Sequence, residues 1–377
     1  MIYLDHAATT PVDKRVLDAM LPYFCDCFGN PSSIHCCGRQ SREAVETARE
    51  QIATLIGAAS PAEIVFTSGG TEADNLAIFG TVCASKGKGR HIVTSKIEHG
   101  AVKQACKKLE HDGYEVTYLG VDGEGRVSPK ELEAAIRPDT VLITIMHANN
   151  EIGTVQPIPE LARIAKLNGI PFHTDAVQTV GKLPICVDAL NVDLLSLSGH
   201  KIYGPKGIGA LYVRKGCRML PFQTGGEQER GRRGGTHNVP GIVGLGMAAA
   251  LADAEMEDEA PRLARLRDRL IKQVLERAPT AQLTGSMTHR TPHNAHFTFV
   301  GVQGDALVAA LDRRGVCASA GSACHSGMGG VSGAVAALGL PPERQEGSLR
   351  LTVGKLNDEA QIDQAVVALL ESLRDLL

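Results

Sequence analysis

Apolar and polar positions follow two alternating periods through the first two-thirds of the chain. Short apolar runs that end in glycine or polar residues, such as EIVFTSGG at 63–70 and TVLITIMHANN at 140–150, predict buried strands. Stretches with a helical repeat, such as ETAREQIATLIGA at 46–58, separate such runs and predict helices. This regular alternation predicts an α/β fold whose mostly parallel sheet is covered by helices on both faces.

The pattern changes at about residue 252. A long charged helix is predicted at 253–279, followed by strands at 294–301 and 347–354 and a closing helix at 363–377. This less regular order predicts a second, smaller α+β domain. We place the large domain at 13–255 and form the small domain from 1–12 and 256–377.

Composition narrows the class of protein. The chain is 43% hydrophobic and 21% charged with a net charge of −3, which is ordinary for a globular protein and gives no basic surface for nucleic acid or anionic lipid. No segment approaches the roughly 20 consecutive apolar residues of a membrane span, and the start lacks the pattern of a secretory leader. We therefore expect a cytoplasmic protein.

Two other patterns resemble binding motifs. Four of the ten cysteines (Cys25, Cys27, Cys36 and Cys37) cluster, but C-x-C and C-C differ from the C-x₂₋₄-C spacing typical of zinc sites, so we predict no metal. GLGMAA, from Gly244, matches a dinucleotide-binding fingerprint. It lies in a predicted helical run rather than after a strand, so we reject that interpretation.

Unusual polar residues follow several predicted strands, at the sheet edge where α/β proteins bind ligands. Gly69, Gly70 and Thr71 lead from a strand into a helix, which suits an anion, although an ordinary helix cap gives the same pattern. His99 follows the next strand, and Asn150 follows a later one. Each of these signals is weak alone.

A carboxylate and a lysine strengthen the pattern. Asp175 and Gln178 come at the end of IPFHTDAVQ, and Lys201 ends an apolar strand that also carries Ser198 and His200. A buried lysine beside a buried carboxylate is either an ion pair or the amine that forms a Schiff base.

One cofactor unites these residues. Pyridoxal 5′-phosphate (PLP) needs a lysine for the imine, a carboxylate at the ring nitrogen, an anion site for phosphate and a group over the ring face. Lys201, Asp175, the turn Gly69–Thr71 and His99 supply one each.

The motifs resemble those of the cysteine desulfurases in the class V aminotransferase group, from end to end. They are YLDHAATTP, FGNPSSIH, TSGGTEADN, EHGAV, NNEIG, DAVQ, SLSGHKIYGPKG, QERGRRGGTHNVPG, ASAGSAC and SLRLTVG. The resemblance implies the PLP-dependent transferase fold of type I with a seven-stranded sheet in the large domain. It also implies a homodimer with active sites at the subunit interface.

The resemblance assigns a role to each residue. Lys201 holds the cofactor and moves the substrate α-proton, Asp175 keeps the ring nitrogen protonated, and His99 stacks on the ring and assists proton transfer. Gln178 bonds the ring hydroxyl. Phosphate ligands are Gly70, Thr71, Ser198 and His200, with Thr236 from the partner subunit. Asn150 and Arg350 bind the carboxylate of the substrate, L-cysteine; a guanidinium suits that geometry.

Cys324, in ASAGSACHSGMGG at 318–330, becomes the nucleophile of this reaction. Its thiolate would take the substrate sulfur as a persulfide, leave alanine, and pass the sulfur to an acceptor protein for iron–sulfur clusters or thio-cofactors. The small domain would carry this loop.

Three features depart from the family pattern. His325 and extra glycines replace the usual residues after the cysteine, R-G-G-T at 233–236 replaces R-S-G-T, and the sequence ends at Leu377 without a tail that some relatives use for docking. His325 either lowers the thiol pKa or is an ordinary exposed histidine.

Three alternatives remain at this stage. A selenocysteine lyase could act without Cys324, and a plain aminotransferase would not need it. A catalytically inactive scaffold is disfavoured by the intact pair of Lys201 and Asp175. The acceptor, the preference for sulfur over selenium and the purpose of the four clustered cysteines are not encoded in these patterns.

Overall fold

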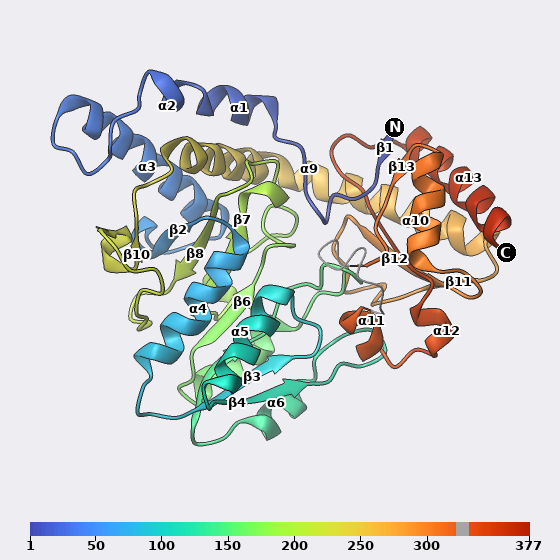
Figure 1. Cartoon of the computed structure of the whole chain (residues 1–377), viewed down its shortest axis with the longest axis horizontal. Coiled ribbons are helices and arrows are strands. Elements are labelled where there is room, and N and C mark those ends of the chain that lie inside the picture. The colour runs from blue at the N-terminus through green and yellow to red at the C-terminus, as the bar shows by residue number, and fades with distance from the viewer. Residues whose placement is uncertain (322–331) are drawn as a thin grey trace.

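The computed structural model describes residues 1–321 and 332–377, and its centre is a seven-stranded sheet. The strand order is β2–β8–β7–β6–β5–β3–β4 (Figure 1). β8 runs antiparallel to both of its neighbours, and the other pairings are parallel. The strands are β2 Ile64–Thr67, β3 His91–Ser95, β4 Glu115–Leu119, β5 Thr140–Thr144, β6 Phe172–Asp175, β7 Leu194–Ser198 and β8 Gly209–Val213. The predicted mostly parallel sheet is confirmed.

Helices cover both faces of this sheet, as the alternation of apolar side chains requires. Along β3, Val93 packs in the core under α3, α7 and α9, whereas its neighbour Ile92 packs in the core under α4 and α5. Ile143 and Leu142 of β5 divide in the same way. These helices are α3 Cys36–Leu55, α4 Gly70–Ala84, α5 Gly100–His111, α7 Ile158–Leu167 and α9 Val239–Arg277.

The remaining elements of this region are short. They are α1 Lys14–Met20, α2 Pro22–Cys25, α6 Pro129–Ala135, α8 Val187–Leu190, β9 Glu227–Gln228 and β10 Arg233–Gly234.

The long helix α9 begins earlier than the sequence predicts. Asn238 caps it by accepting a hydrogen bond from the Gly241 amide, so the helix includes GLGMAA and extends to Arg277. The glycines of that motif permit close packing: a Cβ on Gly246 would lie 2.5 Å from Cβ of Ala48 in α3. The rejection of a dinucleotide site is therefore consistent with a helix-packing role for these glycines.

α9 also connects two hydrophobic cores. Its first half ends in the core of the central sheet at Ala252, and its second half enters another core at Leu263. The domain boundary that we placed at 255/256 lies between these two positions. One 18-residue window of α9 is apolar enough to cross a membrane, but half of it is buried inside the structure, as in the core helix of a globular protein.

The second core belongs to a smaller α+β unit. β12 lies between β11 and β14 in an antiparallel sheet, and the N-terminal β1 pairs in parallel with β13. Its elements are β1 Ile2–Tyr3, β11 Ala281–Leu283, β12 Asn294–Phe299, α10 Gly304–Arg313, β13 Val316–Cys317, α11 Gly333–Ala337, α12 Pro342–Gln345, β14 Ser348–Thr352 and α13 Glu359–Leu376. Both termini lie on this side of the molecule (Figure 1). The chain thus has the predicted large α/β and small α+β architecture.

Candidate functional site

A cavity of about 200 Å³ lies at the carboxyl ends of the central strands, beside the small α+β unit. Ten of the predicted residues line it, from several separate elements and loops. They are Gly70, Thr71, His99, Asn150, Asp175, Gln178, Ser198, His200, Lys201 and Arg350. Thr236 is not among the lining residues, and Cys324 lies outside the part of the chain that the structure describes. The sequence signals at separate strand ends therefore converge on one place.

Lys201 enters the cavity from a short 3₁₀ turn, Gly199–Lys201, directly after β7. Its Nζ donates hydrogen bonds to the carbonyl oxygens of Ala7, at 2.5 Å, and Ala8, at 2.7 Å. The N-terminal segment therefore closes one side of the cavity and holds the amine in place.

Asp175 is the last residue of β6 and is only 6% exposed. Its Oδ1 accepts a hydrogen bond from the Val177 amide at 2.9 Å. Burial raises the pKa of this carboxyl group, while His99 and Lys201 act in the opposite direction. The carboxyl group of Asp175 is therefore ionised only when cationic groups lie near it, and it can then accept a hydrogen bond from a cationic group in the cavity.

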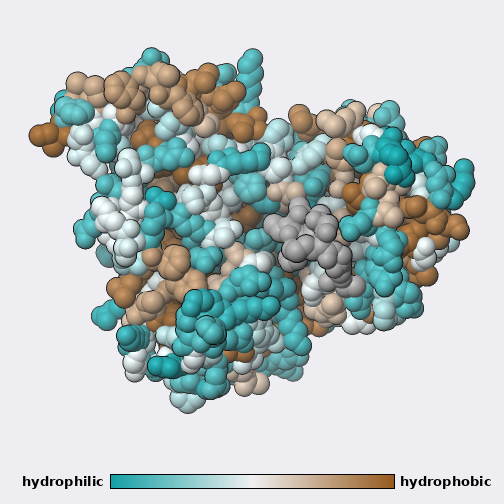
Figure 2. Space-filling view, in the orientation of Figure 1, coloured by the Kyte–Doolittle hydropathy of each residue, from teal (hydrophilic) through white to brown (hydrophobic). Residues whose placement is uncertain are grey.

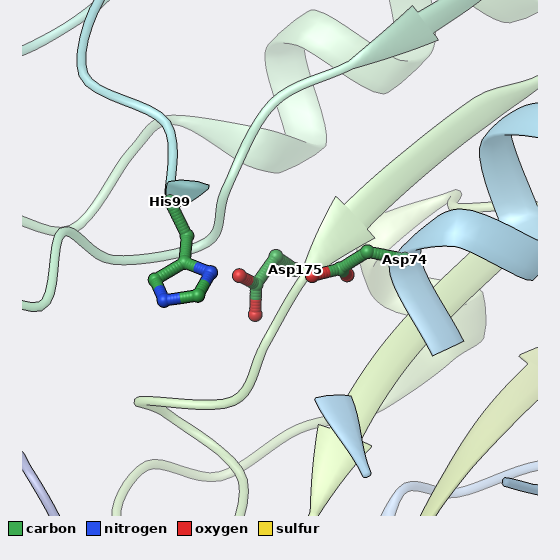
Figure 3. Close-up of side chains that lie close together, drawn as sticks. All are labelled: Asp74, His99 and Asp175. Atoms are coloured by element: carbon green, nitrogen blue, oxygen red, sulfur yellow. The ribbon is translucent and has the colours of Figure 1, made fainter. Parts of the chain in front are cut away.

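His99 caps the N-terminus of α5, and Figure 3 shows its ring beside the Asp175 carboxylate. The ring Nδ1 accepts a hydrogen bond from the Ala101 amide at 3.1 Å. Burial lowers the pKa of His99, so the neutral ring carries its proton on Nε2. This tautomer leaves Nε2 available to donate.

The other side of the cavity is suited to an anion. Gly69 has φ 153° and offers no side-chain cap to α4, so the first amides of this helix are open to a ligand. Gly70 must lack a side chain, because a Cβ would lie 2.8 Å from Cγ2 of Val177. Hydroxyl groups of Thr71 and Ser198 border the same space.

His200 borders the anion side as well. Its Nδ1 lies 3.1 Å from Oγ1 of Thr9. Burial, with the nearby lysines Lys201 and Lys206, lowers the pKa of His200 to about 4. His200 is therefore neutral near pH 7 and contributes a hydrogen-bonding ring rather than a charge.

Arg350, on β14 of the small unit, reaches the far end of the cavity and is 1% exposed. Its Nη2 donates to Oδ1 of Asp5 at 2.7 Å, and its Nη1 donates to the Asn150 carbonyl at 3.0 Å. Its buried Nε has no hydrogen-bond partner within the described residues. A fixed guanidinium with unused donor capacity can bind a carboxylate.

Gln178 and Thr236 lie differently from the other predicted residues. Gln178 lines the cavity, where its Nε2 donates to the Ala7 carbonyl at 3.0 Å. Thr236 is exposed and follows the short strand β10, which is tied to α4 by an ion pair between Arg233 and Glu72 at 2.8 Å. In one chain, Thr236 therefore faces outward rather than into its own cavity.

Asp74 and Asp5 belong to the site but were not predicted from the sequence. Asp74, from α4, lines the cavity and lies with Asp175 and His99 in one cluster whose ligand atoms are all within 4.8 Å. It stands three residues after Thr71, so the helical repeat of TEADN could have placed it on the same face. Asp5 gave no such signal, because its contact with Arg350 joins residues 345 positions apart.

The segment 322–331, which contains Cys324 and His325, is flanked by residues that meet at Glu151. The hydroxyl of Ser332 donates to Oε2 of Glu151, and a Cβ on Gly321 would lie 3.4 Å from the same oxygen. Ser319, just before, exchanges backbone hydrogen bonds with Arg350. Both ends of this segment are therefore attached beside the Arg350 end of the cavity.

The four clustered cysteines lie elsewhere: Cys25 ends α2, Cys27 follows it, and Cys36 and Cys37 begin α3. The Sγ atoms of Cys36 and Cys37 are 3.9 Å apart, and Gln40 donates to Sγ of Cys27. Within residues 1–321 and 332–377, the group formed by Asp74, His99 and Asp175 is the one with metal-ligand spacing, and these thiols form no such group.

Comparison with known proteins gives a consistent family. The family model for class-V aminotransferases matches residues 2–365. The chain is 54% identical over 353 residues to the cysteine desulfurase IscS of Dictyoglomus turgidum, covering 94% of this chain and 89% of the relative. A solved NifS-like protein superposes with a TM-score of 0.93 at 36% identity and 100% coverage of both chains. A structure of SspA in complex with cysteine superposes with a TM-score of 0.82 at 40% identity, covering 94% and 99%.

Proposed function

Because the chain belongs to the class-V aminotransferase family, and within it to the cysteine desulfurases, we propose that it converts L-cysteine to L-alanine with PLP and stores the sulfur on Cys324. The observation that carries this proposal is the convergence of Lys201, Asp175, His99 and Arg350 on one cavity. The solved relative with cysteine bound supports the choice of substrate.

The residues present fit PLP. Ionised Asp175 would accept a hydrogen bond from the protonated ring nitrogen and so keep it protonated, and Lys201 would hold the cofactor covalently. The amides at the start of α4, with Thr71 and Ser198, would receive the phosphate. When bound, PLP supplies an electron sink that weakens the bonds at the substrate α-carbon.

The other residues bind and move protons. Arg350, with Asn150 beside it, would fix the carboxylate of cysteine, which orients the amino group toward Lys201. The amine of Lys201 would then take the α-proton. His99 would donate a proton from Nε2, as its tautomer allows.

Cys324 would perform the sulfur transfer. Its thiolate attacks the substrate sulfur, an S–S bond forms as the C–S bond breaks, and the electron pair passes to the substrate carbon, which takes up a proton to give alanine. The positions of Gly321 and Ser332, the residues that flank Cys324's segment, support this role, because both lie next to Glu151.

We propose a homodimer on two grounds. Thr236 lies outside its own cavity and would reach the phosphate site of the partner subunit. Large apolar side chains are also exposed over α1, α2 and the turn before α3, where Figure 2 shows a hydrophobic area. They are Leu17, Leu21, Phe24, Phe28 and Ile34, with Ile34 87% exposed. A partner subunit would bury such a surface.

In a cytoplasmic setting, the persulfide would pass to an acceptor protein that builds iron–sulfur clusters or thio-cofactors. The relatives named cysteine desulfurase support a sulfur-donating role.

The test compares wild type and Cys324→Ser on L-cysteine, measuring alanine and sulfide. The serine variant should keep the absorbance of the bound cofactor but lose nearly all turnover, because a hydroxyl cannot form the persulfide. Cys317→Ser, in the same small unit, is the matched control and should turn over as wild type. Equal activity of Cys324→Ser would remove the persulfide step. Activity kept on selenocysteine alone would favour a selenocysteine lyase.

A further inference from the structure

Asp74 is a buried acid to which the proposed reaction assigns no role. It lies on α4 with 1% of its surface exposed. Its Oδ1 has no hydrogen-bond partner among the described residues, and the nearby Ser196 hydroxyl favours the ionised form of its carboxyl group. A buried carboxylate without a cation normally takes up a proton.

The nearest ring nitrogen does not supply a positive charge. Nε2 of His173 lies 3.6 Å from Oδ1 of Asp74. Both nitrogens of this ring already meet hydroxyl groups, Thr144 at 2.8 Å and Ser196 at 3.0 Å. Burial lowers the pKa of His173 to about 3, so the ring is neutral. Asp74 therefore has no counter-ion on this side.

On its other side Asp74 faces Asp175, with His99 beyond (Figure 3). One oxygen of each carboxyl group lies within the 4.8 Å cluster that also contains a nitrogen of His99. Two carboxylates this close in a buried place cannot both be ionised, so they share one proton. The cluster also has the spacing of a cation site, but a cation would need both groups ionised.

The surroundings decide which group holds that proton. Asp175 accepts the Val177 amide and has Lys201 among its neighbours, and both favour its ionised form. Asp74 has only the Ser196 hydroxyl to favour its ionised form, and burial and the charge of Asp175 oppose it. Ionised Asp175 beside neutral Asp74 is therefore the favoured arrangement.

We propose that Asp74 is a positioning residue, which holds the shared proton and keeps Asp175 ionised and oriented toward the ring nitrogen of the cofactor. This inference rests on the proposed function, because it gives Asp175 its purpose there. An ionised Asp74 would instead drive Asp175 to take up the proton and lose its hold on a protonated ring. The neutral acid adds a hydrogen-bond donor without adding charge.

The first test needs no cofactor. Infrared spectra of the apo protein near pH 7 report the carbonyl band of each protonated carboxylic acid. The wild-type spectrum minus that of Asp74→Asn should show one such band, because the variant lacks this acid. The same subtraction with Thr81→Val, a change at a buried polar position on the same helix, should show none. A difference spectrum that shows only a carboxylate would overturn the proposal. This result is independent of what the enzyme does with cysteine.

The second test uses the holoenzyme. Asp74→Asn keeps a neutral donor and should bind PLP within about threefold of wild type, with the same pH dependence of its absorbance. Asp74→Leu removes the donor and should weaken PLP binding roughly ten- to a hundredfold, since a hydrogen bond to a charged group is lost. Thr81→Val again serves as the fold control. A leucine variant that binds PLP as wild type does, or an asparagine variant with a shifted pH profile, would contradict the positioning role.

Discussion

The Asp175 end of the cavity and its Arg350 end hold their charges in different ways. The Asp175 end is built by the large domain alone, where Asp175, Asp74 and His99 come from β6, α4 and the start of α5. The Arg350 end joins three distant parts of the chain. Arg350 comes from β14, Asp5 from the N-terminal segment and the Asn150 carbonyl from the loop after β5.

This difference separates two functions. At the Asp175 end, the charge of each acid depends on burial, which makes its protonation sensitive to its neighbours. At the Arg350 end, a charged guanidinium is held in place by the hydrogen bonds that it donates. Changes at the Asp175 end should therefore alter cofactor binding and pH dependence, and changes at the Arg350 end should alter the affinity for substrate.

The largest effect is expected at Asp175. Asp175→Asn removes the charge that faces the ring nitrogen, and loss of one partner of a buried charge pair costs about 2–5 kcal/mol. Cofactor affinity or kcat should therefore fall by roughly 30-fold to several thousand-fold. Absorbance titration with PLP and steady-state kinetics measure the two quantities. Normal affinity together with normal kcat would show that Asp175 does not hold the ring.

Glu98 tests the role of burial at the same end. It accepts hydrogen bonds from Ser95 and the Met146 amide, and burial raises its pKa to about 8. The folded protein therefore binds one proton more than the unfolded chain between about pH 4.5 and 8, so wild type loses stability as pH rises through this window.

Glu98→Gln removes this dependence. The free energy of unfolding of this variant relative to wild type should rise with pH, by at most about 5 kcal/mol, and level off above pH 8. Urea unfolding of the apo protein at a series of pH values measures it, with Glu72→Gln as a partly exposed control on α4. A pH-independent difference would show that burial does not raise the pKa of Glu98 in the folded protein.

Arg350 should affect substrate rather than cofactor. Arg350→Lys keeps the charge but removes the planar pair of donors, and a hydrogen bond to a charged group is worth about 1.5–3 kcal/mol. KM for L-cysteine should rise roughly ten- to a hundredfold while PLP absorbance and PLP affinity stay as in wild type. A loss of PLP together with the rise in KM would mean that the two ends are not independent.

The sequence predicted the two ends unequally. Asp175, His99 and Lys201 follow strands of one parallel sheet, whose carboxyl ends share an edge, so their convergence could be predicted from order alone. Their charge states could not, because Asp74 and Glu98 change them through burial in the folded protein. The role of Arg350 was predicted from the family resemblance alone. The fixation of Arg350 by Asp5 depends on an isolated β-bridge between Asp5 and Thr352 of β14, which no local pattern encodes.

The fold shows the same limit. The strands within 63–70 and 140–150 were predicted, because each carries its own apolar run, but α3 begins at Cys36, ten residues before the predicted start at 46. The start of α9 was missed by 14 residues, since Asn238 and the close packing of Gly246 on α3 decide it rather than charge pattern.

The smallest expected effect separates charge from orientation at the Arg350 end. Asp5→Ala removes the acceptor of Nη2, so Arg350 loses one of its two fixed contacts, and KM for L-cysteine should rise about two- to tenfold. Asp5→Asn keeps an oxygen acceptor at the same place and should leave KM within about twofold of wild type. Steady-state kinetics at saturating PLP compare the pair. If both variants raise KM equally, the charge of Asp5 matters and its acceptor oxygen does not.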